Sequence, residues 1–314
     1  MTAVIQLVDS LKYVEENCYQ HQLLDGLRRS CELRTVELRD VESLTKDPHD
    51  GPIVSCLRLR VLDREHIRIA RALAGRRLTV YDQDPWESFR VNGACRGAYT
   101  RISSAVNVRT FAVTTHAWAA RLQRHGFKSV FVPMGLLPRH CDSSPGWNQR
   151  PIDVGFVGSP HSYRTKLFDD LKKAGITVEL TSGGLTYPQY LEMLNNIKVF
   201  VHREACEYDI GEEDENVQYA EGLWVKDVEA IGRGCVSVRN WHPDAYHHMP
   251  ESLIGGGLRM FEDGCVDEAV NIIRGALDQA SYDVVDCDAE RAQDADTVAK
   301  DDAWLKTARL LIGL

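Results

Sequence analysis

YAEGLWVKDVEAIGRGCVSVRN, residues 219–240, places two carboxylates, Glu221 and Glu229, with seven residues between them, ahead of a glycine break and an apolar run. Eight helical steps of about 100° each turn about 80° net, so both side chains can project toward one side of a cleft. The Val-rich run after Gly234 predicts a strand that follows this helix. The competing interpretation is an ordinary amphipathic helix whose Glu residues face solvent.

The same alternation of helical patterns and short apolar runs extends through the chain, starting with AVIQLV at residues 3–8. This rhythm is typical of βαβ units and a parallel sheet. It is interrupted by LPRHCDSSPGWNQR at 137–150, whose Pro, Ser, Gly and Asn are typical of a linker, and it restarts with IDVGFVG at 152–158. Two such halves predict the α/β class, with two Rossmann-like domains facing across a cleft.

We therefore expect four parts along the chain: an N-terminal Rossmann-like domain at 1–138, a linker at 139–150, a second Rossmann-like domain at 151–285 and a C-terminal helical segment at 286–314. The last part closes with AWLKTARLLIGL, which is amphipathic at helical spacing. By its pattern alone this segment is a capping helix.

The composition is that of a folded protein, with 314 residues, of which 44% are hydrophobic and 26% charged. No apolar run approaches the roughly 20 residues that cross a bilayer, and the N-terminus lacks the pattern of a signal peptide, so we expect a cytoplasmic protein without a membrane span. The nine cysteines are scattered without a C-x-x-C pair. They predict reduced, mostly buried thiols rather than disulfides or a structural zinc site.

Charge is distributed unevenly, although the chain as a whole carries a formal net charge of −9. That sign opposes broad, non-specific attraction to nucleic acid. Arginine is nevertheless concentrated in the first half, in LRLRVLDREHIRIARALAGRR at 57–77 and RLQRHGFK at 121–128. These side chains are either solvated helix faces or a cradle for an anionic acceptor.

The second domain opens with IDVGFVGSPHSYRTK, a strand followed by Gly158-Ser159 and a helix that begins near Ser162. Such a turn directs unpaired N–H groups and the positive end of a helix dipole to the strand's carboxyl edge, where a diphosphate can bind. Arg164 and Lys166 add positive charge. Many strand-to-helix turns look like this and bind nothing, so the turn gains meaning only beside the Glu-x7-Glu element.

That combination resembles a known family. Gly222 after the first Glu, Ala after Glu229, and Gly234 before a Val-rich strand resemble the donor-site signature of GT-B glycosyltransferases of the "group 1" clan. Lys226 matches the basic position of a subgroup that resembles spore-maturation-type glycosyltransferases. The matching motifs lie in the second domain. The first domain resembles the family only in its alternation of strands and helices.

The resemblance implies a site for a nucleotide-diphosphate sugar in the second domain, with no metal and no further cofactor. It implies phosphate contacts from Ser159 and Arg164, and a helix start at Gly222–Leu223 that faces the pyrophosphate. Glu229 would bind the ribose and Glu221 the sugar. Leu223-Trp224 departs from the family's usual aromatic-Gly pair. In GT-B proteins a C-terminal helix often crosses back onto the first domain. The predicted donor-binding residues are Gly158, Ser159, Arg164, Lys166, His202, Arg203, Glu221, Gly222, Leu223, Lys226 and Glu229.

The first domain would hold the acceptor. Asp82 and Asp84 follow a predicted strand and are candidates for a general base, with turn capping as the alternative explanation. An Asp-x-Asp is also the metal motif of another glycosyltransferase fold, but a three-residue match is weak. His116 is a second candidate base. The predicted acceptor-binding residues are Lys12, Tyr13 and Trp86.

The sequence therefore predicts a hexosyl- or pentosyltransferase that is independent of metal. Its catalytic candidates are Asp82, Asp84, His116 and Glu221, and its acceptor is a small molecule, a glycan or a nucleic-acid base. The alternatives are a nucleotide-sugar epimerase or phosphorylase on the same fold and a non-catalytic nucleotide-sugar or nucleic-acid-binding module. His242, His247 and His248 lack further ligands at credible spacing, so no metal site is expected.

Overall fold

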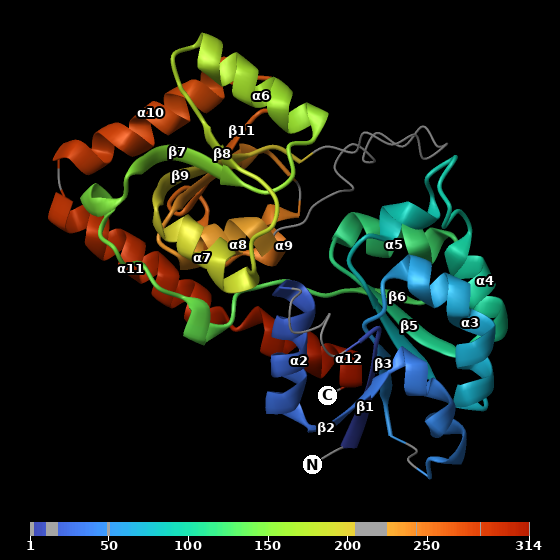
Figure 1. Ribbon diagram of the computed structural model, residues 1–314. Coiled ribbons are helices and arrows are strands. Elements are labelled where there is room, and N and C mark those ends of the chain that lie inside the picture. The colour runs from blue at the N-terminus through green and yellow to red at the C-terminus, as the bar shows by residue number, and fades with distance from the viewer. Residues whose placement is uncertain are drawn as a thin grey trace. The chain divides into compact units, whose positions relative to one another are not determined.

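The computed structural model describes residues 3–10, 18–48, 51–204, 225–242, 244–282 and 284–313. These residues form two compact α/β units, each built on a parallel sheet (Figure 1). Unit 1 contains the described residues within 1–133 together with 304–313, and unit 2 contains those within 134–303. The expected fold class, α/β with two Rossmann-like domains, is confirmed.

The sheet of unit 1 has six strands in the order β2-β1-β3-β4-β5-β6, and every neighbouring pair is parallel. Apart from the edge strand ELRTVE at residues 32–37, its strands are largely apolar runs with few charges, as is typical of parallel strands that are covered on both faces. The strands are β1 (Ala3–Val8), β2 (Glu32–Glu37), β3 (Ile53–Ser55), β4 (Leu78–Asp82), β5 (Val108–Val113) and β6 (Ser129–Phe131).

Helices cover both faces of this sheet (Figure 1). The larger group on one face is η1 (Leu38–Lys46), α3 (Leu59–Leu73), η2 (Pro85–Ser88), α4 (Ala98–Ala105) and α5 (His116–Arg124). The other face carries α2 (Cys18–Ser30) and α12 (Ala303–Ile312). These two helices approach closely, since a Cβ on Gly26 would lie 2.5 Å from the Trp304 carbonyl oxygen. Trp304 is fully buried, and the Thr307 hydroxyl donates to the Pro133 carbonyl.

Unit 2 has five parallel strands in the order β11-β10-β9-β7-β8. The strands are β7 (Ile152–Val157), β8 (Glu179–Thr181), β9 (Ile197–His202), β10 (Val236–Asn240) and β11 (Leu258–Phe261). Helices α6 (Ser162–Lys173) and α10 (Val266–Tyr282) cover one face, and α7 (Tyr187–Asn195), α8 (Val225–Gly232) and α9 (Ala245–His248) cover the other (Figure 1). Helix α11 (Val284–Asp301) packs against α8.

The order of the strands identifies the ligand edge of unit 2. The chain leaves β7 toward β8 on one side and returns to β9 on the other, so β7 and β9 flank the point where the strand order reverses. In open parallel sheets, ligands bind at this switch point, outside the carboxyl ends of the strands. Unit 1 has the corresponding point between β1 and β3.

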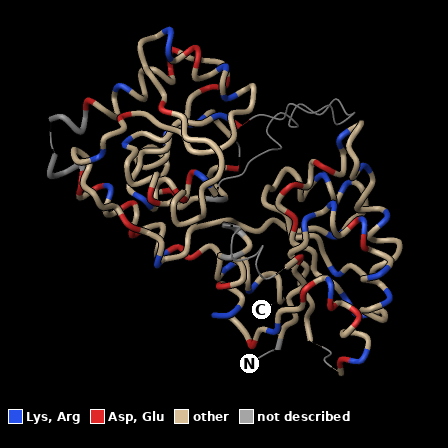
Figure 2. The backbone as a smooth tube through the Cα atoms, viewed as in Figure 1, with Lys and Arg blue, Asp and Glu red and all other residues tan. Residues whose placement is uncertain are grey.

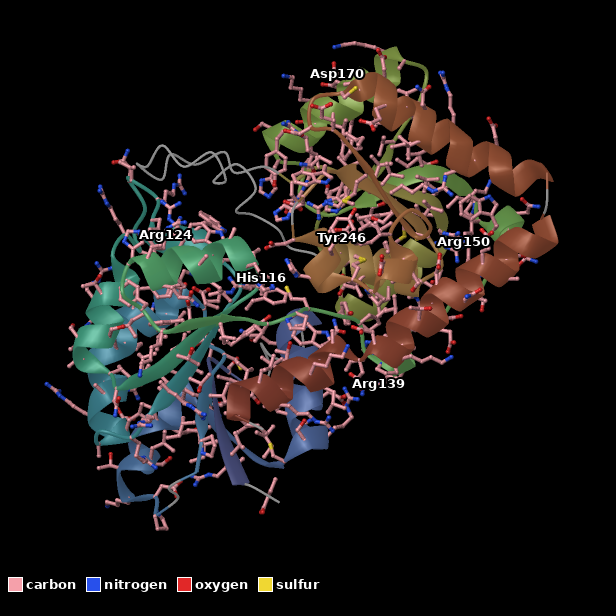
Figure 3. The ribbon with its side chains drawn as sticks, turned by 180° about the vertical axis from the view of Figure 1, so that it is seen from behind. His116, Arg124, Arg139, Arg150, Asp170 and Tyr246 are labelled. Atoms are coloured by element: carbon pink, nitrogen blue, oxygen red, sulfur yellow. The ribbon has the colours of Figure 1, made fainter. Side chains whose placement is uncertain are left out.

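The division between the units falls before the stretch that was expected to be a linker. Residues 137–150 are irregular, with short turns η3 (Pro138–His140) and η4 (Trp147–Gln149), but they belong to unit 2. Arg150 fastens them (Figure 3). Its buried guanidinium donates to the carbonyl oxygens of Ser143 and Arg233, both at 2.8 Å, and to that of Ile197 at 2.9 Å.

Six cysteines belong to the part of the chain whose side chains the structure describes. The described cysteines Cys31, Cys56, Cys95, Cys141, Cys235 and Cys265 are free, as expected. Burial raises the pKa of Cys56 to about 12, although a hydrogen bond from Gln6 opposes that shift. Within the described ranges, no helix combines the length and the apolarity needed to span a membrane.

We predict that Arg150→Met destabilises the protein by about 3–5 kcal/mol, because several buried carbonyl oxygens lose a charged donor together. Denaturant unfolding measures the effect. Arg274→Met is the matched control, since Arg274 is exposed and donates to one carbonyl of the same unit, that of Ala174. An equal, small loss in both variants would contradict the fastening role of Arg150.

Candidate functional site

The turn after β7 contacts the first turn of α8 at the switch point of unit 2. Gly158 has a φ of +149°, a conformation that other residues rarely adopt. A Cβ at this position would also lie 2.9 Å from the Nζ of Lys226. The Lys226 ammonium donates to the Val157 carbonyl oxygen at 3.0 Å and lies 5.5 Å from the centre of the Phe156 ring. Two predicted donor residues, Gly158 and Lys226, which are 68 positions apart in different motifs, are thus brought together at this edge.

Arg164 lies beside this turn, but its charge is used internally. The side chain is buried and pairs with the equally buried carboxylate of Glu204. It also donates to the carbonyl oxygens of Ser159 at 3.0 Å and Arg203 at 3.2 Å. Arg164 therefore ties the turn after β7 to the segment after β9, which are the two segments that flank the switch point.

Beneath these segments lies a buried cluster of charges centred on Asp227 of α8. One carboxylate oxygen of Asp227 accepts from His202 at 2.9 Å and from the Ser237 hydroxyl at 2.6 Å, and the other accepts from Arg239 at 2.8 Å. All four side chains are fully buried. His202 also places Nδ1 3.3 Å from Glu204 Oε1, which joins this cluster to the Arg164 pair.

The sequence had singled out His202 but not Asp227, Arg239 or Glu204. A signal was nevertheless present, because Arg239 interrupts the apolar run CVSVRN. A charged residue inside a buried strand requires a partner of opposite charge. The partner of Arg239 is Asp227, which lies on α8 two residues before Glu229.

The carboxylates of the cluster remain ionised. Burial alone would raise the pKa of Glu204, but the hydrogen bond from His202 and the charges of Arg164, His202 and Arg239 lower it to about 2. The pKa of Asp227 is likewise lowered, because the charges of His202 and Arg239 outweigh burial. Ionised carboxylates only accept hydrogen bonds, so His202, Ser237 and Arg239 all act as donors to Asp227.

Glu229, the predicted ribose ligand, lies on α8 one turn after Lys226. It is buried, and its Oε1 accepts from the Tyr187 hydroxyl at 2.9 Å. Tyr187 begins α7, whose N-terminus is capped by Thr186 and Gln189. Helix α7 therefore fixes the Glu229 carboxylate, and a ribose would have to bind beside the tyrosine.

Two other predicted donor residues line a different hollow. Lys166 and Arg203 border a cavity of about 160 Å³ between α6 and α10, together with Asp170 (Figure 3). The Arg203 guanidinium pairs with Asp263 through bonds of 2.7 and 2.8 Å. The structure thus separates Lys166 and the Arg203 side chain from the group that surrounds Gly158.

In unit 1, Asp82 and Asp84 lie at the carboxyl end of β4, next to the switch point. Asp82 is buried and accepts from the Tyr99 hydroxyl at 2.6 Å and from the Asp84 amide at 3.0 Å. Burial raises the pKa of Asp82 to about 7, with the negative charges of Asp84 and Glu87 adding to the rise and the Tyr99 hydrogen bond opposing it. A base with a pKa near neutrality suits proton transfer, but both Asp82 oxygens are already engaged.

The two other described candidates of unit 1, His116 and Trp86, pack against neighbouring side chains. His116 is exposed at the start of α5 and stacks on Phe131, with 4.1 Å between the ring centres (Figure 3). Trp86 is half-buried against the core beneath α3 and α4. Lys12, Tyr13, Glu221, Gly222 and Leu223 lie outside the described residues.

No cluster of three or more His, Cys, Asp or Glu side chains suited to a metal ion occurs in the part of the chain that the structure describes. His242 is buried, and its Nδ1 accepts from the Asp244 amide at 3.1 Å.

Comparison with solved structures places this geometry in a fold class. An alpha-glucosyltransferase solved with UDP and a 13-mer DNA containing an HMU base aligns over 99% of both chains, with a TM-score of 0.62 and 10% identity. A UDP-forming trehalose-phosphate synthase from Burkholderia xenovorans aligns over 100% of this chain and 99% of its own, with a TM-score of 0.55 and 10% identity. The chain thus has the two-unit α/β fold of GT-B glycosyltransferases.

A third structure, an alpha-glucosyltransferase with UDP-glucose and DNA containing an abasic site, aligns over 94% of both chains with a TM-score of 0.57 and 10% identity. No protein-family model and no curated protein matches this sequence. The likeness is therefore one of fold.

We predict that Glu204→Gln removes part of the acid sensitivity of the protein. A carboxyl group whose pKa is lowered by folding stabilises the native state above its unfolded value of about 4.5 and loses that contribution as pH falls toward 2. The free energy of unfolding should fall less between about pH 5 and about pH 3 in the variant than in the wild type. Exposed Glu192 supplies the control, since Glu192→Gln should keep the wild-type slope.

The opposite sign applies to Asp82. Its raised pKa means that the folded state retains a proton that the unfolded chain releases above 3.8, so stability falls as pH rises toward about 7. Asp82→Asn keeps an acceptor for Tyr99 and removes this cost. The variant should gain stability relative to the wild type across that interval, as measured by urea unfolding at each end; a constant difference would refute the assignment.

Proposed function

We propose that this protein is a glycosyltransferase that takes a sugar from a nucleotide-diphosphate donor held by unit 2 and transfers it to an acceptor held by unit 1. The observation that carries the proposal is the contact between Gly158 and Lys226 at the switch point, with Glu229 one turn further along the same helix. The turn proposed to bind phosphate, the lysine proposed to neutralise it and the carboxyl group proposed to bind ribose are carried by adjoining elements of unit 2.

The chemistry requires stabilisation of the leaving diphosphate. Residues 159–162 lead into α6, a helix of 12 residues, so its first amide groups and the Lys226 ammonium can share the negative charge. Neither a metal ion nor a further cofactor is needed in this arrangement. Arg164 contributes by fixing the Ser159 carbonyl, and with it the path of the turn. Glu221 is proposed for the hydroxyls of the transferred sugar.

For the donor, we propose a uridine nucleotide, because structures of the same fold were solved with UDP or UDP-glucose. We also propose the finer relationship to the group 1 clan and its spore-maturation-type members, which Glu221, Lys226 and Glu229 support. The free thiols support a reducing compartment, and we place the protein in the cytoplasm.

For the acceptor, we propose that Asp84 rather than Asp82 takes the proton, because Asp84 is less buried. His116, exposed at the carboxyl edge of the same sheet, is the second candidate. Trp86, Lys12 and Tyr13 are proposed to border the acceptor. If the reaction proceeds with retention, oxygens of the donor phosphate can assist and a dedicated base is not required.

The donor site is tested by binding of UDP and UDP-glucose, measured by calorimetry. Lys226→Ala should weaken binding about tenfold, which corresponds to about 1.4 kcal/mol, through loss of a charge-assisted contact. Glu229→Gln should weaken binding of both ligands by a similar factor because the ribose loses an ionised acceptor. Lys172→Ala, at the far end of α6, is the matched control and should bind like the wild type.

Absence of binding for uridine, guanosine, adenosine and thymidine diphosphate sugars alike would overturn the donor-site proposal. Binding that is unchanged in both Lys226→Ala and Glu229→Gln would place the donor elsewhere. Product analysis with a labelled sugar nucleotide then distinguishes transfer from epimerisation, since epimerisation needs no acceptor.

A further inference from the structure

Positive charge is segregated on unit 1. Between residues 88 and 133 the chain has six arginines and one lysine and no Asp or Glu, although the whole protein carries a formal charge of −9. Figure 2 shows these basic positions along α4, α5 and the segments beside them, with further arginines on α3. Such an imbalance within one unit of an acidic protein creates a local field that attracts anions.

Some basic side chains of unit 1 differ from the buried arginines of unit 2 in that they are exposed and the fold pairs them with no carboxylate among the described residues. In unit 2, Arg150, Arg164 and Arg239 are buried and donate to partners within the fold. In unit 1, Arg60, Arg96 and Lys128 are exposed, and none of the three forms an ion pair within the described part of the chain. Charges that the fold does not neutralise remain available to a ligand.

The basic residues continue from the ligand edge of the sheet onto its helical face. Arg58 and Arg60 begin α3 at the carboxyl end of β3, and their charges act on Glu87. Arg96 follows Cys95, whose side chain is hydrogen-bonded to the same Glu87. The segment then reaches α5, where the Phe89 ring lies 5.1 Å from that of His125. We call this surface the basic track; its members are Arg58, Arg60, Arg90, Arg96, Arg124 and Lys128.

The type of side chain indicates the type of anion. The basic residues from 51 to 133 are thirteen arginines and one lysine. The planar guanidinium binds phosphate through two parallel hydrogen bonds, and arginine is the preferred residue for nucleic-acid backbones. A track that spans α3, the segment before α4 and the end of α5 is suited to successive phosphates rather than to one.

The same face lacks the feature that single-stranded nucleic acid requires. Proteins that bind single strands stack bases on exposed aromatic side chains. Among the described residues of unit 1, the large hydrophobic side chains with high exposure are Ile67 and Leu310, and neither is aromatic. A double helix presents its phosphates outward and keeps its bases stacked, so it fits a track of cations without a stacking platform.

From these observations we infer that the basic track binds the phosphate backbone of a nucleic-acid double helix and thereby brings a base or terminus to the ligand edge of unit 1. The claim that the track binds the acceptor depends on the proposed glycosyl transfer. The claim that the track binds nucleic acid depends only on the charge, exposure and position of its residues. The substrate class would then be duplex nucleic acid, with Asp84 at the edge where the track begins.

The test is fluorescence anisotropy with a labelled DNA duplex at several salt concentrations. The wild type should bind with an affinity that falls steeply with salt, because bound phosphates release counterions. Arg60→Glu/Arg96→Glu should reduce the affinity at least roughly tenfold and lower the salt slope by roughly 2, one unit for each lost phosphate contact. Lys172→Glu/Arg274→Glu on unit 2 has the same net charge and should bind like the wild type.

Three results would overturn the inference: no duplex binding by the wild type, equal losses in the two charge-matched variants, or tighter binding of the unpaired single strand. UDP binding by Arg60→Glu/Arg96→Glu, which alters unit 1 alone, shows whether the variant is folded and separates the two proposals. Duplex binding by a protein that binds none of the four nucleotide-diphosphate sugars supports the track and refutes the donor site. UDP binding without duplex binding refutes the track and leaves the donor site in place.

Discussion

The ionised carboxylate of Asp227 is the constraint on which the ligand edge of unit 2 depends. Removing a charge from water costs several kcal/mol unless partners replace the lost hydration. Asp227 finds those partners only when the end of β9, the middle of β10 and α8 are all in place, because His202 comes from β9 whereas Ser237 and Arg239 come from β10. Lys226 and Glu229 lie on either side of Asp227 in the sequence. The hydrogen bonds of Asp227 to His202, Ser237 and Arg239 therefore also fix how α8 presents these two residues at the switch point.

Much of the fold could be predicted because buried parallel strands can be recognised in the sequence as short apolar runs. AVIQLV is β1, and IDVGFV is β7, each a continuous apolar run bounded by turn residues. The two-half organisation followed from the restart of this rhythm after residue 150. Such strands can be recognised from their own residues. A strand covered on both faces needs apolar side chains whichever strands become its neighbours.

The pairings that build the site could not be predicted, because they depend on which strands become neighbours. His202 and Asp227 are separated by 25 residues, and Arg164 and Glu204 by 40. Composition indicated the irregular structure of residues 137–150, but it could not show that one buried guanidinium would bind carbonyl groups from several segments. Lys166 was grouped with Arg164 because they are two residues apart, yet along a helix that spacing turns the side chains to different sides.

The return of α12 to the first sheet has a consequence for biosynthesis. The described strands of unit 2 all lie between residues 152 and 261, so they are available to one another while later residues are still being translated. Unit 1 must wait, because Trp304 and Thr307, which cover and bond its second face, are added only after α11 is complete. On the ribosome, the unit whose sequence begins first is therefore the one that finishes last, and its exposed face beside α2 needs protection from aggregation in the interval.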